Sequence, residues 1–231
     1  MFFFPVIFLF MLFYFLLIGG LFFLLKIGLI SLAFQKLGIA PDLVFLLLLL
    51  ILAGSGVNIP VRRLASESLI SEQIIHFFGW KFVVPAFRHK NITILAVNLG
   101  GAVIPTCLSL FLILKWSHLV LYFLVGILVV TFLVNRVARP IKGVGIATPA
   151  LFPPFLAALV ALILGMLAPS GLEAAPVIAY VSGTLGTLVG ADLMNLKKIA
   201  SLGAPVASIG GAGTFDGVFL TGILAVIFTG F

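Results

Sequence analysis

Two acidic residues of this chain occur in otherwise apolar segments, and their type and spacing could support catalysis. Asp192 lies in the stretch GADLMNLKK, and Asp216 follows glycines in the stretch SIGGAGTFDG. A charged carboxylate in the middle of a membrane costs about 2.5–3.5 kcal/mol, so an acid in such a segment is a functional candidate. Two carboxyl groups in contact share one proton, and one then acts as a base toward water while the other acts as an acid toward a carbonyl. The pair therefore predicts acid-base hydrolysis.

Glycines precede Asp216 and would give a substrate access to the main chain. Gly210, Gly211 and Gly213 carry no side chain, so an extended peptide could approach their backbone closely. We therefore expect these glycines to lie along a substrate-binding groove beside the two acids.

A structural interpretation of the same acids stays open. Asp216 could lie in the first turn of the last span, behind Thr214 as the N-cap, where the helix dipole stabilises an anion by about 0.3–1 kcal/mol. Asp192 could instead reach toward Lys197 or Lys198. In that case neither acid would have a catalytic role.

The helical phase of Asp192 raises a second question. On an ideal helix Asp192 projects with Val181 and Leu185, whereas the small residues of the same segment, Gly186 and Gly190 among them, share another side. Small residues mark the closest helix contacts in membranes. Either the helix breaks near Gly190, or Asp192 does not face the tightest contact.

Three asparagines form a second group of intramembrane polar residues. Asn58, Asn98 and Asn135 occur in GVNIP, AVNLGG and NRVARP, where glycine or proline follows within a few residues. Broken helices with free main-chain groups are where many transporters bind ions and substrates, and the stretch GAPVASIGGAG could be a re-entrant loop. The alternative is that each asparagine only satisfies the backbone of a kink.

The remaining side chains argue against other chemistry. His76, His89 and His118 are scattered along the chain, so we expect no metal site and no cofactor. Cys107 is the only cysteine, which excludes a disulfide framework.

The composition indicates a membrane protein. Of the 231 residues, 63% are hydrophobic and 8% are charged, and the mean hydropathy is +1.40. Soluble domains have about 25% charged residues. A helix needs about 20 apolar residues to cross a bilayer, so the chain has room for about seven spans and almost no other domain. We therefore predict an all-α fold: a single transmembrane domain over residues 1–231, built as a polytopic helical bundle with broken or re-entrant segments.

Hydropathy divides the chain into these spans. The first is the uncharged stretch that runs to Leu25, and residues 26–41 are expected at the membrane interface. The second covers residues 42–61. Residues 62–90 are expected to form an amphipathic cytoplasmic loop at the headgroups, with Trp80 as an anchor. The remaining spans are expected at about residues 91–114, 118–135, 149–168, 176–196 and 212–231.

The basic residues predict the orientation of this arrangement. Short loops rich in lysine and arginine stay in the cytoplasm, so the amino terminus is expected inside. The net charge of +7 then describes one membrane face, and no basic stripe interleaved with exposed aromatics indicates a nucleic-acid partner. Ten of the thirteen basic residues fall on the cytoplasmic side: Arg62, Arg63, Lys81, Arg88, Lys90, Arg136, Arg139, Lys142, Lys197 and Lys198.

Four stretches carry a resemblance to a known family. They are AVNLGGAVIP (96–105), VNRVARPIKGVGIATPALFPP (134–154), GADLMNL (190–196) and GAPVASIGGAGTFDGVFLTG (203–222). Together they resemble the prokaryotic membrane family called domain of unknown function 1614. The resemblance implies a polytopic protein of a prokaryotic plasma membrane and brings no activity with it.

A looser resemblance concerns the acids. An aspartate on each of two consecutive spans is similar to the presenilin and signal-peptide-peptidase class of di-aspartyl intramembrane proteases. In that class a Gly-x-Gly motif directly precedes the second aspartate, whereas here Thr214 and Phe215 separate Gly213 from Asp216, and no tyrosine precedes Asp192. The resemblance implies a substrate-binding role for a Pro-Ala-Leu motif, which here precedes the acids as Pro149, Ala150 and Leu151.

These observations lead to three classes of function. The first expectation is an intramembrane di-aspartyl hydrolase, similar to a protease. The alternatives are an ion or small-solute transporter or channel that uses the broken helices, and a non-catalytic membrane subunit or scaffold. The expected partners are membrane lipid and a transmembrane helical substrate or a partner subunit.

Overall fold

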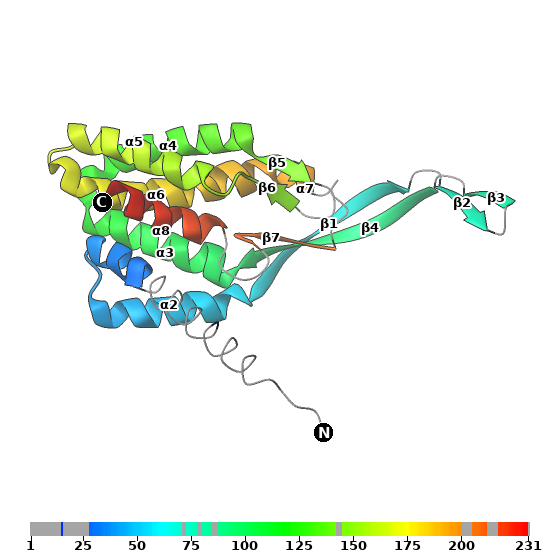
Figure 1. The fold of residues 1–231 in the computed structure, drawn as a ribbon, viewed down its shortest axis with the longest axis horizontal. Coiled ribbons are helices and arrows are strands. Elements are labelled where there is room, and N and C mark those ends of the chain that lie inside the picture. The colour runs from blue at the N-terminus through cyan, green and yellow to red at the C-terminus, as the bar shows by residue number, and fades with distance from the viewer. Residues whose placement is uncertain are drawn as a thin grey trace, which may run out of the picture.

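The fold is mostly helical, with a smaller β component. Figure 1 shows a bundle of helices from which a long β-ribbon extends at one end. This computed structural model describes residues 15, 28–70, 73–77, 80–84, 87–141, 145–199, 205–211 and 217–230.

Prolines begin several helices of the bundle. Proline occupies the first or second position of α2, α3, α5 and α6, where its missing N–H is not needed and its fixed φ favours the helix. A helix Gly28–Lys36 comes before them. The others are α2 (Pro41–Ser55), α3 (Ile104–Lys115), α4 (Val120–Val137), α5 (Phe152–Leu167), α6 (Ala175–Thr187), α7 (Leu196–Ile199) and α8 (Gly217–Thr229). Short turns of other helical types are η1 (Leu99–Val103), η2 (Ser117–Leu119), η3 (Gly171–Ala174), η4 (Leu188–Asp192) and η5 (Leu193–Asn195).

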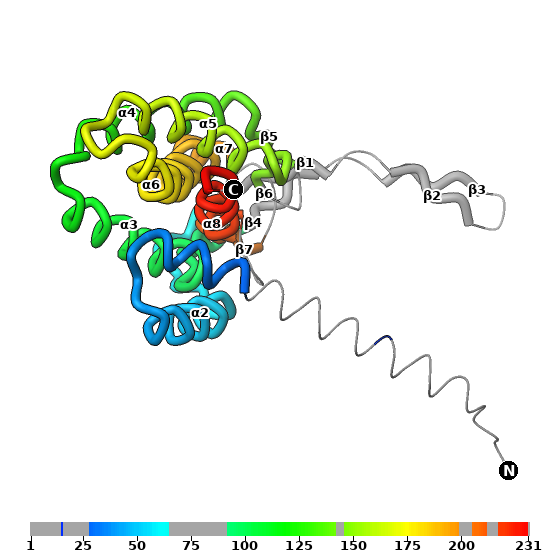
Figure 2. Tube along the Cα trace, turned by 60° about the vertical axis from the view of Figure 1, so that its left-hand side comes forward, coloured from blue at the N-terminus to red at the C-terminus, as the bar shows by residue number. Residues whose placement is uncertain are grey.

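Helix α6 lies at the centre of the bundle. It contacts α3, α4, α5 and α8, and Figure 2 shows it among these helices. Nearly all of its residues are buried. Its small residues allow close approach: a Cβ at Gly186 would lie 2.7 Å from Cβ of Val130 in α4, and one at Gly183 would lie 3.2 Å from Cβ of Ala157 in α5. Such packing of small residues is how helices associate in membranes.

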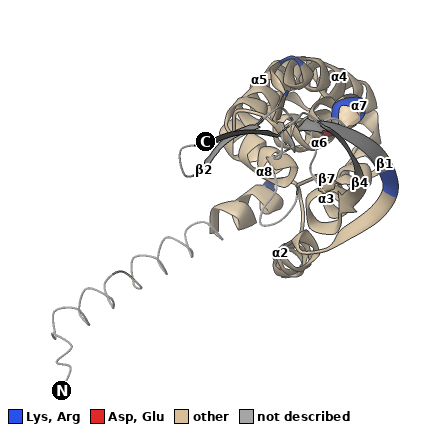
Figure 3. Ribbon diagram, turned by 90° about the vertical axis from the view of Figure 1, so that its right-hand side faces the viewer, with Lys and Arg blue, Asp and Glu red and all other residues tan. Residues whose placement is uncertain are grey.

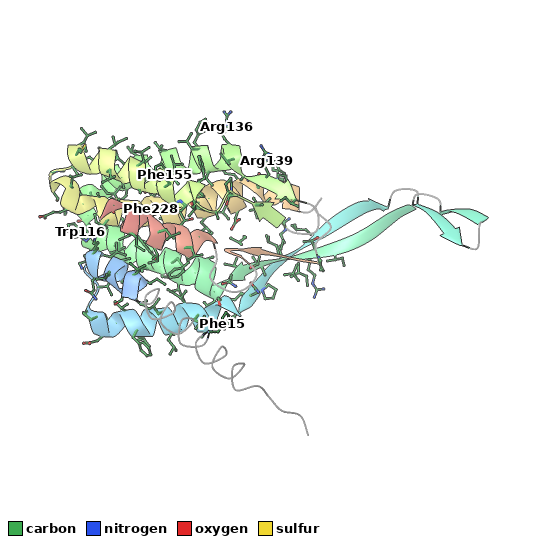
Figure 4. The ribbon with its side chains drawn as sticks, viewed as in Figure 1. Phe15, Trp116, Arg136, Arg139, Phe155 and Phe228 are labelled. Carbon is green, nitrogen blue, oxygen red and sulfur yellow. The ribbon has the colours of Figure 1, made fainter. Side chains whose placement is uncertain are left out.

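The outer faces of the helices are apolar. Phe45 of α2, Leu128 of α4 and Met166 of α5 are each about 70% exposed (71%, 68% and 70%), and they are three of many large hydrophobic side chains on the surface. Figure 4 shows the side chains around the bundle, with Phe155 and Phe228 labelled. Soluble monomers rarely expose continuous apolar surface on this scale. The surface matches a lipid surrounding.

The lengths of the helices are consistent with a membrane protein. Ser117–Val137 and Gly171–Lys198 are long and apolar enough to cross a bilayer, and the pair Gly28–Lys36 and Pro41–Ser55, bent by 118°, is a third candidate. The sequence predicts seven spans, whereas the described residues contain two or three helices that are long and apolar enough to cross a membrane. The first expected span lies outside the described residues, apart from Phe15. Shorter apolar helices are Leu99–Lys115, Phe152–Leu167 and Gly217–Thr229.

A three-stranded sheet adjoins the bundle. β1 (Asn58–Ile70) pairs in antiparallel fashion with β4 (Phe87–Asn98), from Asn58 opposite Asn98 to Ile70 opposite Phe87. β7 (Val206–Ile209) joins β4 in parallel, so the strand order is β1-β4-β7. Two further hairpins pair β2 (Gln73–Phe77) with β3 (Trp80–Val84), and β5 (Arg139–Ile141) with β6 (Gly145–Ala147).

The strands correct the all-α prediction. Within residues 62–90, where we expected an amphipathic interfacial loop, the described residues form strands. Residues 58–61 and 91–98, expected inside the second and third spans, belong to β1 and β4, and the expected re-entrant stretch GAPVASIGGAG contains β7. The segment NITILAVN is rich in β-branched residues, which favour strands. Its pairing on both sides satisfies main-chain groups that a helix would otherwise satisfy internally.

Candidate functional site

Asp192 lies at the end of a π turn that follows α6. The α-helix ends at Thr187, the π turn η4 covers Leu188–Asp192, and a 3-10 turn comes next. The winding of the helix therefore changes over Leu188–Asp192, but the helix does not break at Gly190, because Gly171–Lys198 continues as one helical segment. π turns are rare and occur frequently at functional sites.

The carboxylate of Asp192 is held by the main chain of the glycine segment. The N–H of Gly210 donates a hydrogen bond to Oδ2 of Asp192 over 2.8 Å. Gly210 and Gly211 have φ angles of 81° and 87°, in the left-handed region that favours glycine. A Cβ at Gly210 would also lie 2.5 Å from Cβ of Ala102. The structure thus brings Asp192 and the first two of the candidate glycines together.

Two asparagines bind a carbonyl oxygen inside the π turn. Nδ2 of Asn135 in α4 donates to the carbonyl oxygen of Gly190 over 2.9 Å, and Nδ2 of Asn195 donates to the same oxygen over 3.3 Å. Lys198 in turn donates to Oδ1 of Asn195 over 2.9 Å. A Cβ at Gly190 would lie 2.5 Å from the carbonyl oxygen of Thr131, so α4 and the π turn are in close contact. Asn135 therefore joins α4 to the turn that carries Asp192.

The other two candidate asparagines lie together where the sheet meets the helices. Nδ2 of Asn98 donates to the carbonyl oxygen of Ser55 over 2.7 Å and to Oδ1 of Asn58 over 3.1 Å. Oδ1 of Asn98 accepts from the N–H of Gly101 over 2.7 Å, and the hydroxyl of Ser208 donates to Oδ1 of Asn58 over 2.6 Å. These bonds join the end of α2, both long strands, η1 and β7. The geometry matches the interpretation in which asparagines satisfy the backbone of a break.

The Pro-Ala-Leu residues lie at the end of the bundle that carries Asp192. Pro149, Ala150 and Leu151 are exposed and directly precede α5. β6, which ends two residues before Pro149, packs against the π turn η4. An apolar pocket of about 440 Å³ is lined by Val137, Arg139, Ile141, Ala147, Thr148 and Pro149.

The two remaining candidates, Gly213 and Asp216, lie outside the described residues.

Basic side chains gather at the end of the bundle that carries the ribbon. Figure 3 looks onto this end, and Figure 4 places Arg136 and Arg139 there and Trp116 at the other end. The guanidinium of Arg136 lies 4.7 Å from the ring centroid of Phe132, and Arg139 and Lys197 are exposed. The described part of the chain contains no group of three metal-ligating side chains.

Sequence analysis did not predict two residues that make hydrogen bonds in this region, Asn195 and Ser208. Asn195 follows Asp192 by three residues, and a polar pair at that spacing in an apolar helix is a usable signal. Ser208 reaches Asn58 only because β7 pairs with β4, and no local pattern shows that pairing.

Comparison with protein families adds the family to this geometry. The sequence model described as protein of unknown function (DUF1614) matches residues 52–228. The chain belongs to this family. The match runs from within α2 to within α8 and includes both acids, the glycine segment and the three asparagines. No curated protein and no solved structure matches the chain, so the presenilin-like resemblance has no support from relatives.

Proposed function

We propose that the chain is an intramembrane hydrolase with Asp192 and Asp216 as its two acids. The observation that carries this proposal is the hydrogen bond from the Gly210 N–H to the Asp192 carboxylate, because it ties the first acid to the segment that leads to the second. The full proposal is a seven-span bundle in a prokaryotic plasma membrane, with the amino terminus and the ribbon in the cytoplasm. The basic residues at the ribbon end support that orientation.

The packing of α8 on α6 supports proximity of the acids. The two helices run in opposite directions, and a Cβ at Gly183 would lie 3.4 Å from Cγ2 of Thr221. Because the helices are antiparallel, moving four residues from Gly183 to Thr187 in α6 corresponds to moving back four residues from Thr221 to Gly217 in α8. Gly217 is therefore level with Thr187, the last residue of α6. Asp216 precedes Gly217 in the sequence, and Asp192 is about one helical turn beyond that level. The proposal places the Asp216 carboxyl close enough to that of Asp192 for the two to share one water molecule.

Strand β7 offers a place for the substrate. In the described sheet it is an edge strand, with β4 on one side only, and it ends next to Gly210. An extended peptide could add to its outer edge through main-chain hydrogen bonds and so be carried toward Asp192. We infer that the substrate is a polypeptide segment unwound from a membrane helix.

The proposed reaction uses one ionised and one protonated carboxyl group. The carboxylate takes a proton from water as the water oxygen attacks the amide carbon, and the other acid donates its proton to the carbonyl oxygen. The C–N bond then breaks as a proton passes to the leaving nitrogen. The products are a carboxylic acid and an amine.

Cleavage assays on the purified full chain in lipid vesicles test the proposal. The probe is a library of synthetic single-span helical peptides, with the products identified by mass spectrometry. Asp192→Asn and Asp216→Asn should each abolish cleavage, since the amide cannot exchange the proton. Asp42→Asn is the matched control, because it changes an exposed acid in the first turn of α2. Cleavage that persists in both site variants contradicts the proposal.

A transporter has less support from the same geometry. Asn98 and Asn135 donate their amide hydrogens to main-chain carbonyl oxygens, where they stabilise the breaks. A scaffold is the third class, and it predicts that neither aspartate variant changes any catalytic readout.

A further inference from the structure

The hairpin of β5 and β6 forms one wall of the apolar pocket at the end of α4. Arg139 pairs opposite Ala147, and Ile141 pairs opposite Gly145. Side chains alternate along a strand and directly opposite residues share a face, so Arg139, Ile141 and Ala147 lie on the same face of the hairpin. All three line the pocket. Ile146 lies on the other face and packs against the hydrophobic core. The hairpin is therefore fixed to the bundle by one face and presents the other to the pocket.

The pocket lies where a candidate membrane span ends. Ser117–Val137 has 21 residues. At about 1.5 Å per residue its length is about 31 Å, which matches a hydrocarbon core of about 30 Å. Val137 is the last residue of this helix and lines the pocket. In a bilayer that this helix crosses, the pocket therefore lies at the level of the lipid headgroups.

Two stripes of exposed apolar side chains run away from the pocket. The stripe on α4 ends at Phe132, one helical turn before Arg136, and the stripe on α5 begins at Leu151, two residues after Pro149 of the pocket. Residues three or four apart share one face of a helix, so each stripe is continuous. The two helices contact each other. The stripes consist of Leu121, Leu124, Leu128 and Phe132 on α4, and of Leu151, Phe155, Leu159 and Ile163 along α5.

The charge at the pocket is positive. Arg139 lines it and is exposed, and the neighbouring Arg136 holds its guanidinium 4.7 Å from the ring centroid of Phe132, at the end of the α4 stripe. Figure 4 labels both arginines at this end of the bundle. A guanidinium group forms paired hydrogen bonds with phosphate oxygens. None of the six residues that line the pocket is acidic, so a headgroup that also carries a cation finds no anionic partner among them.

We propose that this pocket binds an anionic phospholipid, with the phosphate against Arg139 and the two acyl chains along the stripes of α4 and α5. Its volume of about 440 Å³ lies in the range of small-ligand sites, about 300–1,000 Å³. Basic pockets at the ends of membrane helices commonly bind anionic headgroups. The proposal assigns Pro149 and Leu151 to lipid, in place of the substrate role that the Pro-Ala-Leu resemblance implies. It goes beyond the hydrolase function and does not depend on it.

Native mass spectrometry of the full chain in detergent micelles tests the proposal. The probes are phosphatidylglycerol and phosphatidylcholine with the same acyl chains, each titrated alone. We expect phosphatidylglycerol to bind about fivefold more tightly or better, as the attraction of one basic residue for an anionic headgroup predicts. Equal affinities for the two lipids overturn the proposal.

Variants assign the preference to the pocket. Arg139→Gln should lower the affinity for phosphatidylglycerol about fivefold and leave that for phosphatidylcholine unchanged. Ala147→Phe keeps the charge but fills the pocket, and it should weaken phosphatidylglycerol binding as well. Arg63→Gln is the matched control, because Arg63 is an exposed arginine of β1 that does not line the pocket. Unchanged binding in Arg139→Gln overturns the proposal, as does an equal loss in Arg63→Gln, which indicates general charge attraction.

A soluble competitor distinguishes a lipid from a free phosphate compound. Glycerol 3-phosphate carries the phosphate without acyl chains, so at the concentration of the phospholipid it should leave the phospholipid bound. Displacement at that concentration shows that the apolar stripes contribute nothing and overturns the lipid assignment. These measurements and the cleavage assay fail independently, because lipid binding is measured without any substrate and the variants of the pocket leave both aspartates in place.

Discussion

At the scale of the residue, the main chain positions Asp192. Its Oδ2 accepts a hydrogen bond from the N–H of Gly210, and the left-handed φ of that glycine aims the N–H there. An N–H donor can bond equally to an amide oxygen. The structural and chemical roles of the carboxylate can therefore be separated by substitution.

The first prediction uses that separation. Asp192→Asn keeps an acceptor for Gly210 and should lower the free energy of unfolding by less than about 1 kcal/mol, whereas Asp192→Ala leaves the N–H without its acceptor and should cost about 1–3 kcal/mol. Thermal unfolding in detergent, followed by circular dichroism, measures the difference. Equal losses in the two variants would show that the Gly210 bond contributes nothing to stability.

The second prediction concerns Asn98, which is 1% exposed and makes three hydrogen bonds. Asn98→Ala leaves buried main-chain groups without partners and should lower the free energy of unfolding by about 2–4 kcal/mol. Asn58→Ala, at an exposed position, should cost only about 1 kcal/mol. The same unfolding measurement compares them, and a larger loss at Asn58 would contradict the described network.

Sequence reasoning found several residues of this region and missed their partners. Asp192 and Asn98 stand out because a polar side chain in an apolar segment is rare and costly. Their partners are main-chain groups such as the Gly210 N–H, and every residue except proline carries one. Composition and spacing therefore predict which side chains matter, and only the fold shows what they bind.

At the scale of the element, departures from the regular α-helix shape the site. η1 replaces an α-helical start at Leu99–Val103, and η4 replaces the regular end of α6. η1 packs directly on α2, where a Cβ at Gly100 would overlap the carbonyl oxygen of Ile51 and the amide nitrogen of Ser55. Two backbones thus touch where the sheet enters the bundle.

The third prediction tests this contact. Gly100→Ala should lower the free energy of unfolding by about 1–3 kcal/mol or more, because rigid backbone atoms must move to admit the methyl group. Gly56→Ala is the control, since its φ is −77° and the nearest atom to an added Cβ, the carbonyl oxygen of Ala53, is 3.7 Å away. That variant should be neutral or up to about 1 kcal/mol more stable. Chemical denaturation in micelles ranks the pair, and the reverse order would contradict the close contact.

The sequence predicts whether a segment is a helix or a strand only where its hydrophobic residues follow one clear period, helical or extended. Long apolar segments such as α4 and α6 were assigned correctly, because hydrocarbon length leaves few alternatives. The strands between residues 58 and 98 were missed, since short runs of mixed polarity fit a helical and an extended period equally. Pairing with a distant strand decided between them, and that information is not local.

At the scale of the whole molecule, the basic residues are distributed unequally between the two ends of the bundle. Strand β1, which carries Arg62 and Arg63, and helix α7, which carries Lys198, lie at the ribbon end (Figure 1). Lys115 directly precedes Trp116, which Figure 4 labels at the opposite end, and its Nζ donates to the carbonyl oxygen of Gly38. This asymmetry supports a cytoplasmic ribbon.

The fourth prediction is the resulting topology. In a Cys107→Ser background, Arg63→Cys and Lys198→Cys should resist a membrane-impermeant thiol reagent applied to intact cells, whereas Lys115→Cys should react. Reaction after permeabilisation is the control for accessibility. Labelling of only one of the first two positions in intact cells would contradict the proposed orientation.

The position of β7 and α8 in the chain gives the molecule an order of assembly. β7 pairs with β4, and α8 packs against η1, α5 and α6, so β7 and α8 are synthesised after these partners. Until β7 and Gly210 have been synthesised, β4 lacks its second neighbour and Asp192 lacks the Gly210 N–H. If the two acids form a hydrolase, the nascent protein is therefore inactive while its earlier helices are being inserted beside those of other newly made proteins. Late synthesis of the last strand and helix then serves the purpose that a removable propeptide serves in other hydrolases.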